Sequence, residues 1–104
     1  MPRIIDLAAY RTAGVLVFAG RDRGELVRAK ARVEEADKEA EPVEVRVPED
    51  VFGVTSSFFL GMFDKSVKRF GDDGFRKHYH FTGKDISAVL DDGIREALRT
   101  GSPL

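Results

Sequence analysis

We expect a turn from strand to helix in Phe52-Gly53-Val54-Thr55-Ser56-Ser57-Phe58-Phe59, where three hydroxyl residues precede an apolar helix. Side-chain oxygens at the start of a helix accept hydrogen bonds from backbone N–H groups that have no partner inside the helix. The aligned peptide dipoles also favour a negative charge at that end, including that of a phosphate. The sequence therefore predicts that Thr55 or Ser56 is the N-cap, in a position where a phosphorylated hydroxyl would be tolerated.

The residues on either side of this turn predict the strand and the helix that it joins. Upstream, valines at positions 43, 45 and 47 alternate with charged residues, which is the period of a half-buried strand. Downstream, apolar residues repeat at steps of three and four until Gly71: Phe59, Met62, Phe63, Val67 and Phe70. We expect this aromatic stripe to form core rather than to line a cofactor site.

The N-terminal part predicts two strands and a charged helix. Two apolar runs, Arg3 to Leu7 and Gly14 to Ala19, indicate a β-hairpin or a pair of strands. Asp22 and Glu25 have capping-box spacing, so we expect a helix from there to Pro42. Its thin apolar stripe predicts shallow packing: Leu26, Ala29, Val33, Ala36 and Ala40.

The C-terminal part predicts a loop at Asp72-Asp73-Gly74, a strand from Arg76 to Phe81 and a final helix. Thr82 and Asp85 have capping-box spacing, and Gly101-Ser102-Pro103 ends the helix. Its expected core stripe is Ile86, Val89, Leu90, Ile94, Ala97 and Leu98. The predicted order β-β-α-β-α-β-α makes residues 1–104 a single α/β domain, with a mixed sheet of about four strands and three helices.

Composition narrows the classes of function. The 104 residues are 42% hydrophobic and 34% charged, which is typical of a domain that folds alone. A net charge of -1 gives no general attraction to nucleic acid or to an anionic membrane. The absence of Cys excludes disulfides and thiolate ligands, and the glycines form no phosphate-binding loop. We therefore expect no cofactor. Since the sequence has no signal-peptide or membrane-spanning pattern, we expect a cytoplasmic protein.

Two groups of polar residues offer weaker evidence of function. Basic residues fill the first half of the first predicted helix, and acidic residues follow: Arg21, Arg23, Arg28, Lys30 and Arg32, then Glu34, Glu35, Asp37, Glu39 and Glu41. We interpret them as a solvated surface, with a basic patch for an acidic partner as the alternative. His78 and His80 share one face of the predicted strand, but two imidazoles without a third ligand do not make a metal site.

Several segments resemble STAS domains, the anti-sigma-factor-antagonist modules. Their strand, turn and helix start are similar to Glu44-Val45-Arg46-Val47 and to Val51 through Phe63. Gly20-Arg21, the Thr-Ser-Ser-Phe turn and Phe81-Thr82-Gly83 more closely resemble, over most of the chain, the uncharacterised bacterial STAS-like family. In sigma-regulating STAS proteins, a partner kinase of the histidine-kinase-like ATPase fold phosphorylates a serine in an Asp-Ser-Ser or Asp-Ser-Ala-Gly turn. The resemblance puts Ser56 on that position with Ser57 beside it, while Thr55 replaces the acidic residue and Phe58 a small glycine.

The resemblance implies a small regulatory module that is not an enzyme and that is switched by phosphorylation at Ser56 or Ser57. The partner surface that we expect comprises Val54, Thr55, Ser56, Ser57, Phe58, Arg21 and Arg23. One alternative is a metal-assisted or acid–base enzyme that uses His78 and His80. Another is a structural subunit that forms a homodimer through an exposed sheet face or edge strand.

Overall fold

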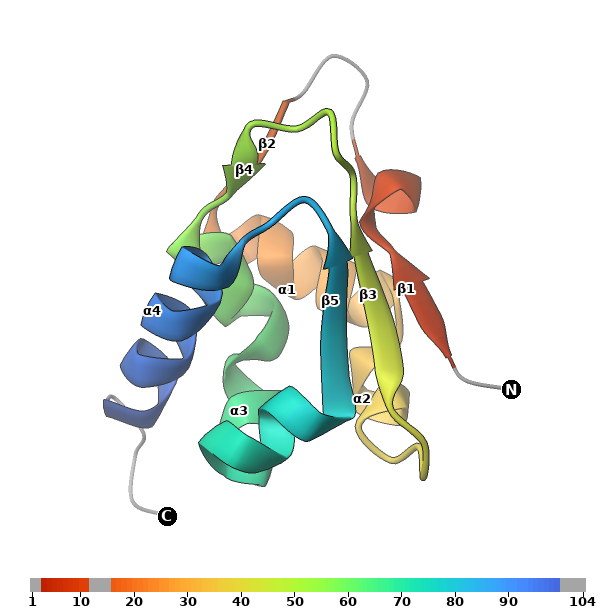
Figure 1. Cartoon of the computed structure of the whole chain (residues 1–104), viewed down its shortest axis with the longest axis vertical. Coiled ribbons are helices and arrows are strands. Elements are labelled where there is room, and N and C mark those ends of the chain that lie inside the picture. Colours follow the sequence, from red (N-terminus) through yellow and green to blue (C-terminus); the bar gives the residue numbers. More distant parts are fainter. Residues whose placement is uncertain (1–2, 12–15, 100–104) are drawn as a thin grey trace.

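The central sheet has three parallel strands, and helices cover one of its faces (Figure 1). The computed structural model describes residues 3–11 and 16–99. The strands β1 (Ile4–Asp6), β3 (Val43–Val47) and β5 (Tyr79–Gly83) pair in the order β1-β3-β5. The three valines of β3 are buried, so their alternation with charged residues predicted both the strand and its inward face correctly.

A separate sheet pairs β2 (Val17–Phe18) with β4 (Gly53–Val54), also in parallel. The predicted pairing of the runs Arg3 to Leu7 and Gly14 to Ala19 is wrong, because β1 and β2 belong to different sheets; Gly14 and Val15 lie outside the described residues. The single mixed sheet is wrong as well. Every described pair of strands is parallel, because each is joined by a crossover that contains helices.

The second face of the central sheet is not covered by any described element. Its side chains, which are exposed or half-buried, are Ile4, Asp6, Glu44, Arg46, His80 and Thr82. The Thr82 hydroxyl donates to Glu44 Oε2 at 2.8 Å, and Arg46 Nε donates to the same oxygen at 2.9 Å. Parallel sheets are usually covered on both faces. Here charged and hydroxyl side chains take the place of a second layer.

The first predicted helix consists of two helices, α1 (Arg21–Lys30) and α2 (Val33–Ala36). Arg32 separates them in the left-handed region, with φ 59° and ψ 50°. The N-cap of α1 is Gly20, which has no side chain to bond, so the predicted capping box of Asp22 and Glu25 is wrong. A short 3-10 helix, η1 (Leu7–Tyr10), follows β1 directly and lies before β2 in the chain.

The face that α1 buries differs from the predicted stripe. Leu26, Ala29 and Ala40 are exposed, whereas Val33 and Ala36 of α2 are fully buried as expected. The buried face of α1 consists instead of small, apolar and charged residues at helical spacing: Gly24, Val27, Arg28 and Ala31. Periodicity of apolar residues alone selected the wrong side of this helix, because a glycine and an arginine contribute to the contact.

The helices α1 and α3 (Ser56–His78) cross in direct backbone contact, which contradicts the predicted shallow packing. A Cβ added to Gly24 would lie 2.2 Å from the Phe58 carbonyl oxygen, and one added to Gly61 would lie 2.1 Å from the Arg21 carbonyl oxygen. Neither position has room for any side chain. This pair of glycines therefore sets the distance between the two helices.

The helix α3 contains the predicted aromatic stripe and bends at Gly71, where φ is 76° and ψ is 177°. Phe59, Met62, Phe63 and Val67 are buried, which confirms their assignment to the core. The helix then resumes and continues to His78. The loop predicted at 72–74 is therefore wrong, and the strand predicted from residue 76 begins only at Tyr79.

The last helix is α4 (Ser87–Arg99), which packs against α3. The predicted capping role of Thr82 is wrong because Thr82 lies within β5; Asp85 Oδ1 instead accepts from the Ser87 backbone N–H at 2.9 Å. Ile86, Ile94 and Ala97 are buried, whereas Leu98 is exposed. The predicted end of the helix at 101–103 lies outside the described residues.

The described residues thus form a compact α/β domain with four α-helices rather than the predicted three. All of the described aliphatic and aromatic core residues belong to one buried cluster between the central sheet and the helices. None of the helices within 3–11 and 16–99 is both long and apolar enough to cross a membrane.

Candidate functional site

The hydroxyl residues lie at the first turn of α3, as the sequence predicted. Thr55 has extended backbone angles, and its Oγ1 accepts from the Phe58 backbone N–H at 3.2 Å, so it is the N-cap. The Ser57 hydroxyl lies 3.1 Å from Thr55 Oγ1. Ser57 is exposed and Ser56 is half-buried. Both serines are therefore accessible at the electropositive end of the longest described helix, and Ser57 is the more exposed of the two.

An exposed aromatic residue precedes this turn. Phe52 is 77% exposed, and its backbone N–H donates to the Leu16 carbonyl oxygen at 2.7 Å. Leu16 is itself 43% exposed. This backbone bond pairs two segments that are far apart in sequence, each with a large exposed apolar residue, just ahead of β4 and the hydroxyl turn. Neither residue was predicted to belong to a site. Burial of a phenylalanine this exposed by a partner would be favourable by about 2 kcal/mol.

The residues of the predicted partner surface differ in exposure and in position. The side chains of Val54 and Phe58 belong to the core and have no access to a partner. Phe58 packs against Phe18 with ring centroids 5.2 Å apart, which explains why an aromatic residue occupies this position. Arg21 and Arg23 line different grooves on opposite sides of α1. The groove of Arg21 shares Leu60 with the groove that Ser56 and Ser57 line, whereas the groove of Arg23 shares no residue with it.

Ser56 and Ser57 open into a groove between α3 and α4 of about 520 Å³. Its other lining residues are Leu60, Asp92, Arg95, Glu96 and Arg99. Arg95 pairs with Asp92 at 3.1 Å, and Arg99 pairs with Glu96. Because these pairs are exposed, they are weak, and both guanidinium groups can exchange partners at little cost. The groove therefore places cationic side chains on the same surface as the two serines.

The two histidines are not arranged as a pair. His78 is the last residue of α3, stacks on Phe70 with ring centroids 4.8 Å apart and donates from Nε2 to the Ala36 carbonyl oxygen at 2.8 Å. His80 lies on the uncovered face of β5. The predicted common face is wrong, because the helix extends through His78. Across the described part of the chain, no three His, Cys, Asp or Glu side chains come together as metal ligands do.

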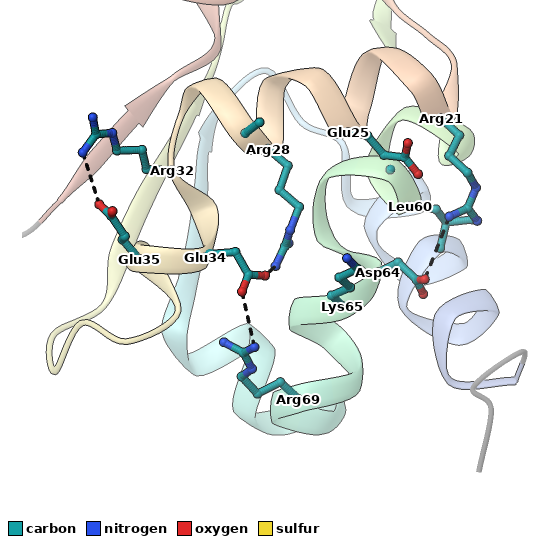
Figure 2. A pocket seen from close by; sticks show the side chains of 12 residues that line it. Arg21, Glu25, Arg28, Arg32, Glu34, Glu35, Leu60, Asp64, Lys65 and Arg69 are labelled. Carbon is teal, nitrogen blue, oxygen red and sulfur yellow. Dashed lines mark hydrogen bonds and ion pairs between the residues drawn. The ribbon is translucent and has the colours of Figure 1, made fainter. Parts of the chain in front are cut away.

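A larger groove, of about 630 Å³, lies between α1, α2 and α3 (Figure 2). We call it the α1–α3 groove. Ala29, Leu60 and Gly61 provide its apolar lining, and its other lining residues are charged. At one end Arg21 lies 3.9 Å from Asp64 Oδ2, while Asp64 Oδ1 is buried without a hydrogen-bond partner. At the other end the Glu34 carboxylate bridges Arg28 and Arg69 (Figure 2).

Behind Glu34 lies a buried carboxylate, Asp37, whose side chain is 0% exposed. Ser66 Oγ donates to Asp37 Oδ1 at 2.8 Å, the Tyr79 hydroxyl donates to the same oxygen, and Arg69 lies 3.1 Å from Oδ2. Arg28 lies 3.5 Å from Oδ2 and also donates to the Met62 carbonyl oxygen at 2.7 Å. Asp37 is thus fully compensated by hydrogen bonds and cations, as a buried charge must be.

The pKa values of this cluster follow from its geometry. Burial, together with the hydrogen bond to Asp37, raises the pKa of Tyr79 far above its usual value, so Tyr79 remains a neutral donor. The hydrogen bond from Arg28 lowers the pKa of Glu34, with smaller contributions from the charges of Arg28, Arg69 and Lys65. Glu34 is therefore ionised at neutral pH, although it lies at the surface.

No pattern in the sequence predicts this cluster. Arg28 and Asp37 belong to a run of charges that is typical of solvated surface, and Ser66, Arg69 and Tyr79 lie 29 to 42 residues beyond Asp37. Comparison of the chain with protein-family models, with curated proteins and with solved structures found no match.

Proposed function

We propose that this protein is a small regulatory module that binds a protein partner and is switched by phosphorylation at Ser57 or Ser56. Its contact surface is the β4–α3 surface, which we define as Leu16, Phe52, Thr55, Ser56 and Ser57. The observation that carries the proposal is the exposed Phe52 in the segment that leads to two accessible serines at a helix N-terminus. The similarity of the turn to that of sigma-regulating STAS domains supports the same function.

Phe52 and Leu16 supply the apolar anchor for this contact. Interfaces commonly depend on a few large side chains that a partner removes from water, surrounded by polar groups. Ser56 and Ser57 follow Phe52 by four and five residues and supply such polar groups. A partner that covers the segment from Phe52 to the first turn of α3 also covers both serines, so that the chemical state of the serines affects binding.

Phosphorylation here would change binding without unfolding the domain. The N-terminus of α3 favours the added charge, and Arg95 and Arg99 line the groove into which both serines open. About two negative charges on the contact surface would repel a partner that packs closely on Phe52. The switch therefore acts on the partner's affinity.

The proposal is tested by incubation with a histidine-kinase-like ATPase from the same genome and ATP, followed by mass spectrometry of the modified peptide. We expect phosphate on Ser57 or Ser56, and none after replacement of both by alanine. Modification confined to other residues, or no modification by any such ATPase, would contradict the switch.

The contact surface is tested separately by a pull-down with the protein as bait. The variant Phe52→Ser should lose the captured partner, whereas Leu98→Ser, which changes an equally apolar exposed residue on α4, should retain it. Equal capture by both variants would show that the β4–α3 surface is not the contact. Size-exclusion chromatography over a range of concentrations separates this result from self-association.

A further inference from the structure

We propose that the α1–α3 groove is a binding site for a phosphomonoester, whose phosphate takes the place of the Glu34 carboxylate between Arg28 and Arg69. This site is distinct from the β4–α3 surface and does not depend on the function proposed for it.

The two guanidinium groups are held in place by the protein and not by Glu34. Arg28 is buried and is fixed by the Met62 carbonyl oxygen at 2.7 Å and by Ser66 Oγ at 3.0 Å. Arg69 is fixed by Asp37 Oδ2 at 3.1 Å. Both anchors remain when Glu34 moves away. The donors of an oxyanion site therefore exist before any ligand arrives, which lowers the entropic cost of binding.

The Glu34 carboxylate fills the proposed phosphate position and can be displaced from it. Its side chain is 55% exposed and lies on α2, which has only four residues. Each of its oxygens faces one guanidinium: Oε1 accepts from Arg28, and Oε2 lies 3.6 Å from Arg69 Nη2. A planar anion between two guanidinium groups is the arrangement that these side chains also adopt around phosphate oxygens.

The charge left behind fits a dianion better than a carboxylate. With Glu34 displaced, the charges that remain around its position are the cations Arg28, Arg69 and Lys65 and the carboxylate of Asp37, so cations are in excess there. A phosphomonoester carries about two negative charges at neutral pH and offers three oxygens. A carboxylate ligand carries only one charge and would gain nothing over Glu34 itself.

The remainder of the groove accommodates the organic part of the ester. Its volume of about 630 Å³ greatly exceeds that of a phosphate, and Ala29, Leu60 and Gly61 provide an apolar wall next to the cations. Arg32 lies at the rim and is engaged with Glu35 at 3.7 Å (Figure 2). The ester can come from a free metabolite or from a phosphorylated side chain, because the arginines recognise the phosphate alone.

The test measures binding of phenyl phosphate to the full chain by amide chemical shifts, with phenyl sulfate as a probe of the same shape and one charge fewer. We expect saturable shifts around Arg28 and Arg69 with phenyl phosphate and at least tenfold weaker binding of phenyl sulfate. The variant Glu34→Gln should bind phenyl phosphate at least fivefold more tightly, because it removes the competing charge. Arg69→Gln should bind at least tenfold more weakly, and Arg95→Gln on α4 should bind as the wild type does.

No saturable binding by the wild type and Glu34→Gln alike, or equal affinity of the two, would overturn the proposal. Arg69→Gln is used in place of a change at Arg28 because Arg69 is 44% exposed, and the amide spectrum verifies that the variant folds. A phosphoserine peptide and a nucleoside monophosphate then distinguish the sources: tighter binding of the peptide assigns a phosphoprotein, and tighter binding of the nucleotide assigns a metabolite.

Discussion

Replacement of Gly61 by alanine should destabilise the protein through the crossing of α1 and α3. The new Cβ would lie 2.1 Å from the Arg21 carbonyl oxygen and 2.9 Å from the Glu25 backbone nitrogen. Because both neighbours are backbone atoms, no change of side-chain rotamer relieves the overlap, and the helices must separate by about 1 Å to restore normal contact. Overpacking of this kind costs about 3 kcal/mol or more. Alanine regains about 1 kcal/mol of helix propensity, which leaves a net loss of about 2 kcal/mol.

Urea denaturation followed by circular dichroism measures this loss as a lower midpoint at unchanged slope. In a domain of this size the melting temperature should fall by about 10 °C. Gly53→Ala is the matched control, because its Cβ would meet nothing within 4 Å. If Gly61→Ala were as stable as the wild type, the two helices would not approach each other at these glycines and the arrangement of the α1–α3 groove would also be wrong.

Three further predictions concern single side chains. Asp37→Asn should lower the free energy of unfolding by about 3 kcal/mol, because it removes the buried charge that Ser66, Tyr79 and Arg69 bond and leaves Glu34 as the remaining counter-charge of Arg28, and urea denaturation should show no such loss for the exposed Asp50→Asn. The raised pKa of Tyr79 means that the folded state holds this proton more tightly than the unfolded chain does, so its contribution is complete below about pH 10 and is lost as the pH rises further. Denaturation at pH 8 and pH 11 should therefore show a steeper loss for the wild type than for Tyr79→Phe, and parallel losses would contradict the assignment. Thr55→Ala should cost about 1 kcal/mol by removal of the N-cap of α3, whereas Thr55→Ser should be nearly neutral.

The sequence predicted best where one periodicity acts alone. The alternating valines of β3 and the apolar repeat after Thr55 each face one side of a continuous core, so their pattern determines both element and orientation. The N-cap at Thr55 was predictable for the same reason, since it depends on residues three positions apart. β4 was missed because a strand of two residues has no period to detect.

The errors in α1 and α3 have a different physical origin. The buried face of α1 at positions 24, 27, 28 and 31 has helical spacing. A search for periodic apolar residues does not find this face, because two of its four residues are glycine and arginine. At Gly71 a glycine was read as a helix end, whereas the chain bends there and resumes the helix. A positive φ at glycine is compatible with either outcome, and only the packing of the following turn decides between them.

The two candidate sites also differ in how far the sequence predicts them. The serine turn is local, so its residues were found, while Phe52 was not assigned because exposure of an apolar side chain is decided by the tertiary fold. The Arg28–Glu34–Arg69 cluster depends on three helices meeting. No spacing of residues in the sequence predicts this contact between helices. The charged residues that form the cluster are of the types that are common on any protein surface.

The passage from α3 to β5 has no loop, since Tyr79 is both the C-cap of the helix and the first residue of the strand. One residue inserted after His78 would turn the strand's side chains by one position, so that Tyr79 and Phe81 exchanged faces with His80 and Thr82. The aromatic core and the Asp37 cluster would then lose their partners together. Fusion proteins and epitope tags should therefore not be inserted at this junction, because no loop is present to absorb the added residues.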